Sequence, residues 1–209
     1  MKYNSINIEN FRGIQKLEID DMKGVNLIVG KNNCGKTSIL EAIFLNAGMS
    51  NPQLAYSINL QRGLILTHNN DFNFLFYNAN FQKNIIITAQ TSEKKRDLNI
   101  SSFIEKSTPQ NIINGPFVEN VDGALQCNGL IFRFDVNNNL YNSVVRIRQD
   151  NSGDYHIDTP QLSQYTETFR CRIQTQKFLL ESKLFIDDLQ ELMLPKKLTP
   201  IIEILKEID

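Results

Sequence analysis

Residues 30–37 read Gly30-Lys31-Asn32-Asn33-Cys34-Gly35-Lys36-Thr37 and match the pattern G-x-x-x-x-G-K-[ST] at every fixed position. An apolar run, Val25 to Val29, precedes this loop, and apolar residues recur at helical spacing from Ile39 to Ala47 after it. We therefore predict a central strand buried on both faces, a phosphate-binding loop, and a helix that stops at Gly48. This order of strand, loop and helix is the structural context in which the pattern binds phosphate.

The chemistry expected of this loop is the binding of a nucleoside triphosphate. Its glycines let backbone N–H groups converge on phosphate oxygens, and Asn32 and Asn33 tolerate a left-handed backbone. Lys36 is the candidate catalytic residue because it brings positive charge to the β- and γ-phosphates, and the Thr37 hydroxyl is the candidate Mg²⁺ ligand. Ser38 follows, where it can donate to the α-phosphate. The candidate nucleotide-binding residues of the loop are Gly30, Asn32, Asn33, Cys34, Gly35, Lys36, Thr37 and Ser38.

Residues on both sides of the loop carry a resemblance to a known family. Asn10-Phe11-Arg12-Gly13 precedes the loop, and Leu40-Glu41-Ala42-Ile43 follows it. With residues 25–38, they resemble the N-terminal part of the ABC-type ATPase head of SMC-like, RecF-like and overcoming-lysogenization-defect (OLD) proteins. Val29 departs from that family, which has asparagine or a similar polar residue there. The specific part of the resemblance lies within residues 1–50.

The resemblance implies a fold, a ligand and partners. The fold is an α/β P-loop NTPase of the ABC head type, with a mixed sheet, an antiparallel β-subdomain and helices at the C-terminal end. By the resemblance, ATP and Mg²⁺ are shared between two heads, so a second copy of the chain is the expected partner. The resemblance also implies that the full-length protein acts in DNA repair, chromosome handling or phage defence. The resemblance also implies that Arg12 contacts phosphate or relays the nucleotide state, although a surface arginine in a turn fits the residue pattern equally well.

The family further implies an acidic strand end, a glutamine, a signature segment and a switch histidine. The nearest acidic segment is Leu184-Phe185-Ile186-Asp187-Asp188, but it leads into a helical pattern, which favours Asp187 as a helix cap. The glutamine could be Gln61, Gln174 or Gln176. We therefore expect an ATPase whose hydrolysis is completed by elements absent from this chain. The alternative is a nucleotide-binding regulatory module without turnover.

The rest of the chain predicts strands followed by helices within one lobe, residues 1–209. Ile6 and Ile8, and then Leu17 and Ile19, alternate with polar residues around a turn, which predicts two antiparallel strands. One helix is expected over residues 54–64. Residues 51–158 form a mixed region and β-subdomain, and residues 159–209 form a helical tail. The last apolar stripe runs to Ile208, so we expect a longer protein.

Strands of the β-subdomain are expected at residues 84–89, 130–136 and 144–148, where β-branched or alternating residues recur. The polar segment from Glu93 to Asn120 contains two prolines and predicts a surface excursion.

Composition limits the remaining possibilities. The formal net charge is −1, so any nucleic-acid contact depends on a local patch. The candidate patches are Lys94-Lys95-Arg96 and Arg146, Arg148, Arg170 and Arg172, for which a solvated face is the expected role. The histidines, His68 and His156, lack a nucleophilic constellation. The cysteines are widely spaced and no apolar window approaches a membrane span, so we expect a reduced, cytoplasmic chain without membrane contact.

Overall fold

The computed structural model describes residues 2–64, 71–103, 127, 129–136, 138–150, 152–167, 171 and 173. All of them belong to the first of two units, Met1–Ile173, and the second unit, Gln174–Asp209, lies outside the described residues. Several expectations from the sequence therefore also lie outside them. These are the helices after residue 174, the acidic segment 184–188, Gln174, Gln176, His68, Arg170 and Arg172.

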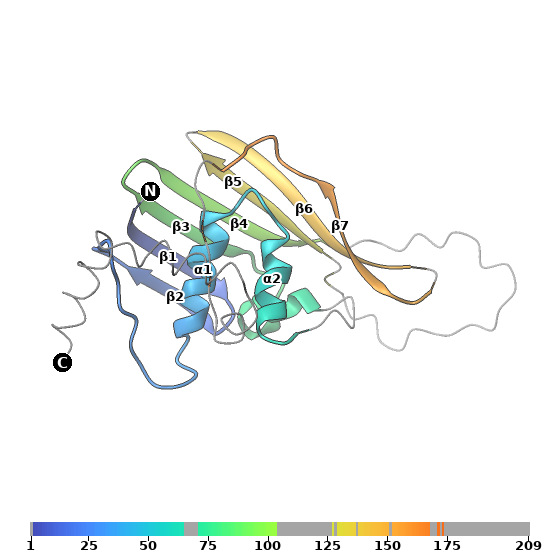
Figure 1. Cartoon of the computed structure of the whole chain (residues 1–209), viewed down its shortest axis with the longest axis horizontal. Helices are drawn as coiled ribbons and strands as arrows, with labels where there is room; N and C mark the ends of the chain where they lie inside the picture. Colours follow the sequence, from blue (N-terminus) through green and yellow to red (C-terminus); the bar gives the residue numbers. More distant parts are fainter. Residues whose placement is uncertain are drawn as a thin grey trace, which may run out of the picture. The chain divides into compact units, whose positions relative to one another are not determined.

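Seven strands form one sheet in the order β2-β1-β3-β4-β5-β6-β7 (Figure 1). Their bounds are β1 Tyr3–Phe11, β2 Ile14–Ile19, β3 Ile85–Thr91, β4 Lys95–Phe103, β5 Gly129–Val136, β6 Asn139–Gln149 and β7 Tyr155–Gln161. Every pair of neighbouring strands is antiparallel. The expected antiparallel β-subdomain is confirmed. The expectation of a mixed sheet is wrong for the described residues, because a mixed sheet needs at least one parallel pair and these seven strands form only antiparallel pairs.

One face of the sheet is buried and the other is more exposed, because apolar and polar residues alternate along its strands. In β3, Ile85, Ile87 and Ala89 are buried while their neighbours are more exposed. The register aligns Ile87 with Ile8 on one side and with Leu98 on the other, so buried side chains share one face across the strands. This face forms the hydrophobic core with the helices.

Two α-helices and two short 3₁₀ helices cover this face. They are α1 Lys36–Ala47, α2 Leu54–Gln61, η1 Asp71–Leu75 and η2 Tyr77–Ala79. Helix α1 packs on β1, β3 and β4 and contacts α2 (Figure 1). The helices predicted after the loop and at residues 54–64 are thus confirmed, and Gly48 caps α1 as expected. Within the described residues, no helix is both long enough and apolar enough to cross a membrane.

The prediction of a central strand at Val25–Val29 is wrong. These residues run from β2 toward the loop outside the sheet, and Val25, Leu27 and Val29 are 59%, 69% and 76% exposed. An apolar run predicts a buried strand only if another strand is available to pair with it. Among the described residues, no strand pairs with this segment.

The polar segment after Glu93 holds a central strand instead of a surface excursion. Strand β4 lies between β3 and β5, and its alternate residues Arg96, Leu98 and Ile100 are buried. Asp97 and Asn99 point to the opposite face of the sheet, so the polar character of the segment concealed its period of two. Residues 104–120 lie outside the described part of the chain. Similarly, β7 continues to Gln161, past residue 159 where the helical tail was expected to begin.

Arg96 belongs to the core and not to a basic surface patch. Its side chain is 0% exposed, and its Nη2 donates to the carbonyl oxygens of Asn46 and Ala47, both at 2.9 Å. It also forms an ion pair with Glu167. The last carbonyl groups of a helix lack partners inside the helix, so Arg96 from β4 satisfies the C-terminal end of α1. Burial raises the pKa of Tyr3, whose hydroxyl donates to the side chain of Asn46 beside this cluster.

Candidate functional site

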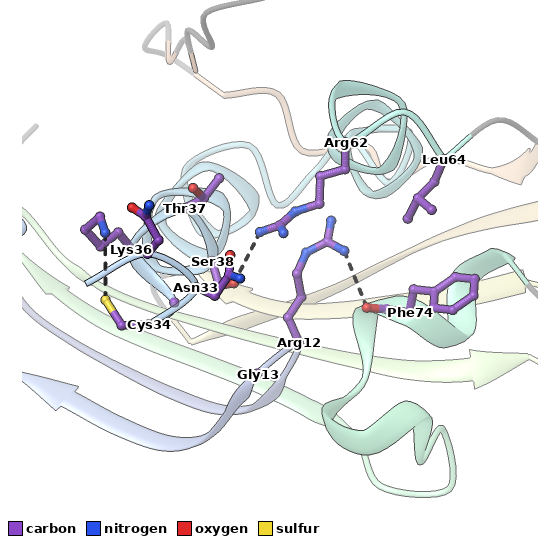
Figure 2. A pocket seen from close by; sticks show the side chains of 12 residues that line it. Arg12, Gly13, Asn33, Cys34, Lys36, Thr37, Ser38, Arg62, Leu64 and Phe74 are labelled. Carbon is purple, nitrogen blue, oxygen red and sulfur yellow. Dashed lines mark hydrogen bonds between the residues drawn. The ribbon is translucent and has the colours of Figure 1, made fainter. Parts of the chain in front are cut away.

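A cavity of about 1090 Å³ opens at the N-terminal end of α1 (Figure 2). One wall consists of residues 32–38, from the loop and the first turn of α1. The other lining residues are Arg12 and Gly13 from the β1–β2 turn, Arg62 and Leu64 after α2, and Phe74 from η1. The structure thus brings together all the sequence-predicted site residues except Gly30, which does not line the cavity.

The backbone of the loop depends on its glycines. Gly35 is the N-cap of α1 with φ 96°, a left-handed conformation that glycine adopts without strain. Gly30 has φ 155°, and a Cβ there would lie 2.7 Å from the Sγ of Cys34. Asn33 adopts φ 62°, as expected for an asparagine in such a loop, whereas Asn32 does not have a positive φ. The loop therefore needs a residue without a side chain at positions 30 and 35.

Lys36 is the first residue of α1, and its side chain contacts the backbone of the loop. Its Nζ donates to the carbonyl oxygens of Gly30 and Lys31, both at 2.7 Å, and lies 3.9 Å from the Sγ of Cys34. Gly30 thus contributes to the site through its carbonyl group. An ammonium group has three donors and a flexible stem, so it can exchange a carbonyl oxygen for an anionic one without a change in the backbone.

The first turn of α1 offers further groups to the cavity. Among the residues that the structure describes, no side chain caps this helix N-terminus, and the macrodipole makes it favourable for an anion. Thr37 is exposed and lines the cavity, so its hydroxyl is accessible to a cation. Ser38 is buried, and its Oγ accepts a hydrogen bond of 3.3 Å from Arg62. Within the described residues, no group of three or more His, Cys, Asp or Glu side chains could hold a metal ion by itself.

A buried carboxylate, Glu41, holds two arginines at the cavity wall. Glu41 is 1% exposed and accepts from Arg12 at 2.6 Å and from Arg62 at 2.7 Å. Arg12 also donates to the side chain of Asn59 at 3.0 Å. Burial lowers the pKa of Arg12, and the charge of Glu41 opposes that shift. The paired carboxylate fixes the direction of both guanidinium groups where they border the cavity.

The backbone of Arg12 is held as firmly as its side chain. Its φ is 50°, a left-handed value that is uncommon for a residue other than glycine. Its N–H donates to the carbonyl oxygen of Leu75 at 2.7 Å, and its Nη1 donates to that of Phe74 at 3.4 Å (Figure 2). The interpretation of Arg12 as a surface arginine in a turn is therefore wrong, since its side chain is only 7% exposed.

Four residues of the site were not predicted from the sequence: Glu41, which organises the two arginines, and Arg62, Leu64 and Phe74, which line the cavity. One signal pointed to Glu41. It lies three residues after Ser38 and four before Leu45, so all three face the core from one side of α1. No comparable pattern marks Arg62, because its role depends on how α2 packs against α1.

The other candidates do not join the cavity. Gln61 ends α2, and its Oε1 is buried without a hydrogen-bond partner among the described residues. His156 is exposed and pairs with Asp150 at 2.7 Å, which lowers the pKa of that carboxyl. Arg146 and Arg148 both pair with Asp158. The Arg148 side chain is 53% exposed, which agrees with a solvated face, whereas that of Arg146 is only 15% exposed, so the predicted solvated face is wrong for Arg146.

ATP·Mg²⁺ at ten times its dissociation constant is expected to slow maleimide labelling of Cys34 by about tenfold. Cys34 is exposed and lines the cavity, so a bound ligand would cover it. The measurement uses a Cys171→Ser variant, because Cys171 is also exposed. Cys127 is buried and burial raises the pKa of its thiol to about 11, so it should react slowly. Equal labelling rates with and without ATP·Mg²⁺ would mean that the thiol does not face the bound ligand.

Comparisons with known proteins show what this chain is similar to. The DNA replication and repair protein RecF of Francisella tularensis subsp. mediasiatica (strain FSC147) is 38% identical over 103 residues, which is 49% of this chain and 28% of that protein. RecF of Francisella tularensis subsp. novicida (strain U112) matches with the same identity and coverage. The chain thus spans 28% of the length of these curated relatives.

The expected resemblance to RecF-like ATPases is confirmed by these relatives. A family model described as an AAA ATPase domain matches residues 1–203, nearly the whole chain. We conclude that the chain belongs to the AAA ATPase domain family.

Proposed function

We propose that this chain is the ATP·Mg²⁺-binding part of an ABC-type ATPase head of the kind found in SMC-, RecF- and OLD-like proteins. The observation that carries the proposal is the cavity, one wall of which is the phosphate-binding loop, residues 32–38. Lys36, Arg12 and Arg62 bring positive charge to it, and the N-terminus of α1 adds its partial charge. A triphosphate chain is the ligand that such a wall favours.

Each predicted site residue has a role in this proposal. Lys36 contacts the β- and γ-phosphates, Ser38 the α-phosphate, and the loop from Gly30 to Gly35 supplies N–H groups. Mg²⁺ fits the site, because Thr37 offers an accessible hydroxyl and Mg²⁺ takes most of its other ligands from phosphate and water. Held by Thr37, Mg²⁺ would supply positive charge that offsets the negative charge of the phosphates. Arg12 acts at the cavity wall, with its direction set by Glu41.

The proposal extends to partners. A second head, a second copy of the chain, faces the loop and completes hydrolysis together with groups that lie outside this chain. The relatives are named DNA replication and repair proteins, and we therefore propose that the full-length protein contacts DNA in the cytoplasm. By the family resemblance, its process is DNA repair or phage defence.

Slow turnover is the expected result when the purified chain is given ATP·Mg²⁺. Phosphoryl transfer depends on positioning and charge neutralisation, and the loop, lysine and Mg²⁺ supply part of that arrangement. We expect Mg²⁺-dependent binding by calorimetry with phosphate release slower than about 1 s⁻¹, which is low for an enzyme. Faster, Lys36-dependent release would show that the chain completes the catalytic site by itself. Absence of ATP binding would contradict the proposed function, and binding with no turnover in the full-length protein would favour a regulatory module.

A further inference from the structure

The cavity has two chemically different ends. Loop residues form one end, and Leu64 and Phe74 form the other, with Arg12 and Arg62 between them in Figure 2. The first end is polar and positively charged, whereas the second presents apolar side chains. A nucleoside triphosphate is divided in the same way, into an anionic chain and a flat base with apolar faces.

Phe74 is the exposed member of a buried apolar segment. Phe72, Leu75 and Phe76 around it are all buried in the core, whereas the Phe74 side chain is 55% exposed. The three buried residues hold the segment on the core, so Phe74, which lines the cavity, lies on a supported turn. An exposed aromatic side chain on a supported backbone beside a cavity is a common feature of ligand sites.

The position of Phe74 is tied to the polar end of the cavity. The guanidinium of Arg12 donates to the Phe74 carbonyl oxygen, and the Arg12 N–H donates to the next carbonyl, that of Leu75. Phe11 and Phe76 form an antiparallel bridge beside these contacts. The main chain of η1 is thus anchored to the same arginine that pairs with Glu41 behind the loop. Both ends of the cavity are therefore parts of one connected arrangement.

We infer that Phe74 is the platform on which the purine base of the nucleotide stacks, with Leu64 packed against the edge of the base and the phosphates at the loop. This inference rests on the proposed nucleotide-binding function. Stacking recognises the face of a base and not its hydrogen-bonding edge, so Phe74 strengthens the binding of ATP and GTP alike. It adds nothing to the binding of the phosphate chain itself.

Calorimetry with three Mg²⁺-bound probes, ATP, GTP and inorganic tripolyphosphate, separates the base from the phosphates. Phe74→Ala is expected to weaken both nucleotides by about tenfold, the effect of losing one stacked aromatic ring, and to leave tripolyphosphate unchanged. The matched control is Leu162→Ala, since Leu162 is also an exposed apolar residue but does not line the cavity. An equal loss for tripolyphosphate, or no loss for ATP, would overturn the inference. If the wild-type chain bound none of the probes, the proposed function itself would fail.

A second readout does not depend on truncating the ring. The chain contains no tryptophan, so Phe74→Trp introduces a single tryptophan, whose fluorescence can be excited selectively over that of the six tyrosines. We expect ATP·Mg²⁺ to quench this fluorescence by stacking, and tripolyphosphate·Mg²⁺ to leave it unchanged. Leu162→Trp is the control and should respond to neither probe. Unchanged fluorescence of the Phe74→Trp variant, at ATP concentrations that calorimetry shows to be saturating, would contradict base stacking at this position.

Discussion

Replacing Lys36 with alanine is expected to weaken the binding of ATP·Mg²⁺ by at least about 100-fold. Two charge-assisted hydrogen bonds to phosphate, each contributing about 1.5–3 kcal/mol, are lost together, and 100-fold corresponds to about 2.7 kcal/mol. Lys36 lines the cavity, and its ammonium group already lies on the loop carbonyls of Gly30 and Lys31. Calorimetric titration of ATP into wild type and variant measures the change.

The matched control for Lys36 is Lys23→Ala. Lys23 is an exposed lysine that pairs with Asp21 and does not line the cavity, so its removal should leave ATP affinity unchanged. Since Lys36 also bonds to the loop, thermal unfolding of both variants establishes whether the fold is retained. A folded Lys36→Ala variant with the affinity of wild type would exclude Lys36 from the nucleotide site.

The second large effect is expected at Glu41, where glutamine in place of glutamate should lower the free energy of unfolding by about 3–5 kcal/mol. The carboxylate is 1% exposed and is the shared counterion of the buried guanidinium of Arg12 and of the partly exposed guanidinium of Arg62. Glutamine keeps the volume of the side chain but leaves two adjacent positive charges without their counterion. Urea unfolding followed by circular dichroism measures the shift of the midpoint.

Glu9→Gln makes the same chemical change at an exposed ion pair. Glu9 pairs with Lys16 at 3.1 Å, and the Lys16 side chain is largely in solvent. Exposed pairs contribute at most about 1 kcal/mol, so this variant should unfold close to wild type. If the two glutamine variants unfolded at the same urea concentration, the buried pairing around Glu41 would not stabilise the fold.

Elements whose contacts are local in the chain could be predicted from the sequence. The β1–β2 hairpin, the loop followed by α1, and α2 all follow from periodicity and turn residues within short windows. The loop residues of the site were predicted for the same reason, since the pattern that binds phosphate is contiguous. Neighbouring residues carry all the information that these features need.

Features that depend on distant partners could not be predicted. Glu41, Arg12 and Arg62 come from three separate elements, and only the packing of α1 against α2 and the β1–β2 turn brings them together. β4 was missed because a buried arginine, Arg96, occupies a core position of the strand and finds its partners at the end of α1. Val25–Val29 was misassigned because burial of an apolar run depends on what lies beside it.

The exposed side chains of Val25, Leu27 and Val29 are expected to promote self-association of the protein at high concentration. An extended apolar segment outside a hydrogen-bonded ladder favours pairing between molecules, which leads to self-association and precipitation. None of these three side chains lines the cavity. Substitutions of these three residues by polar ones are therefore expected to reduce self-association with little effect on ligand affinity, although the segment joins the loop directly at Gly30.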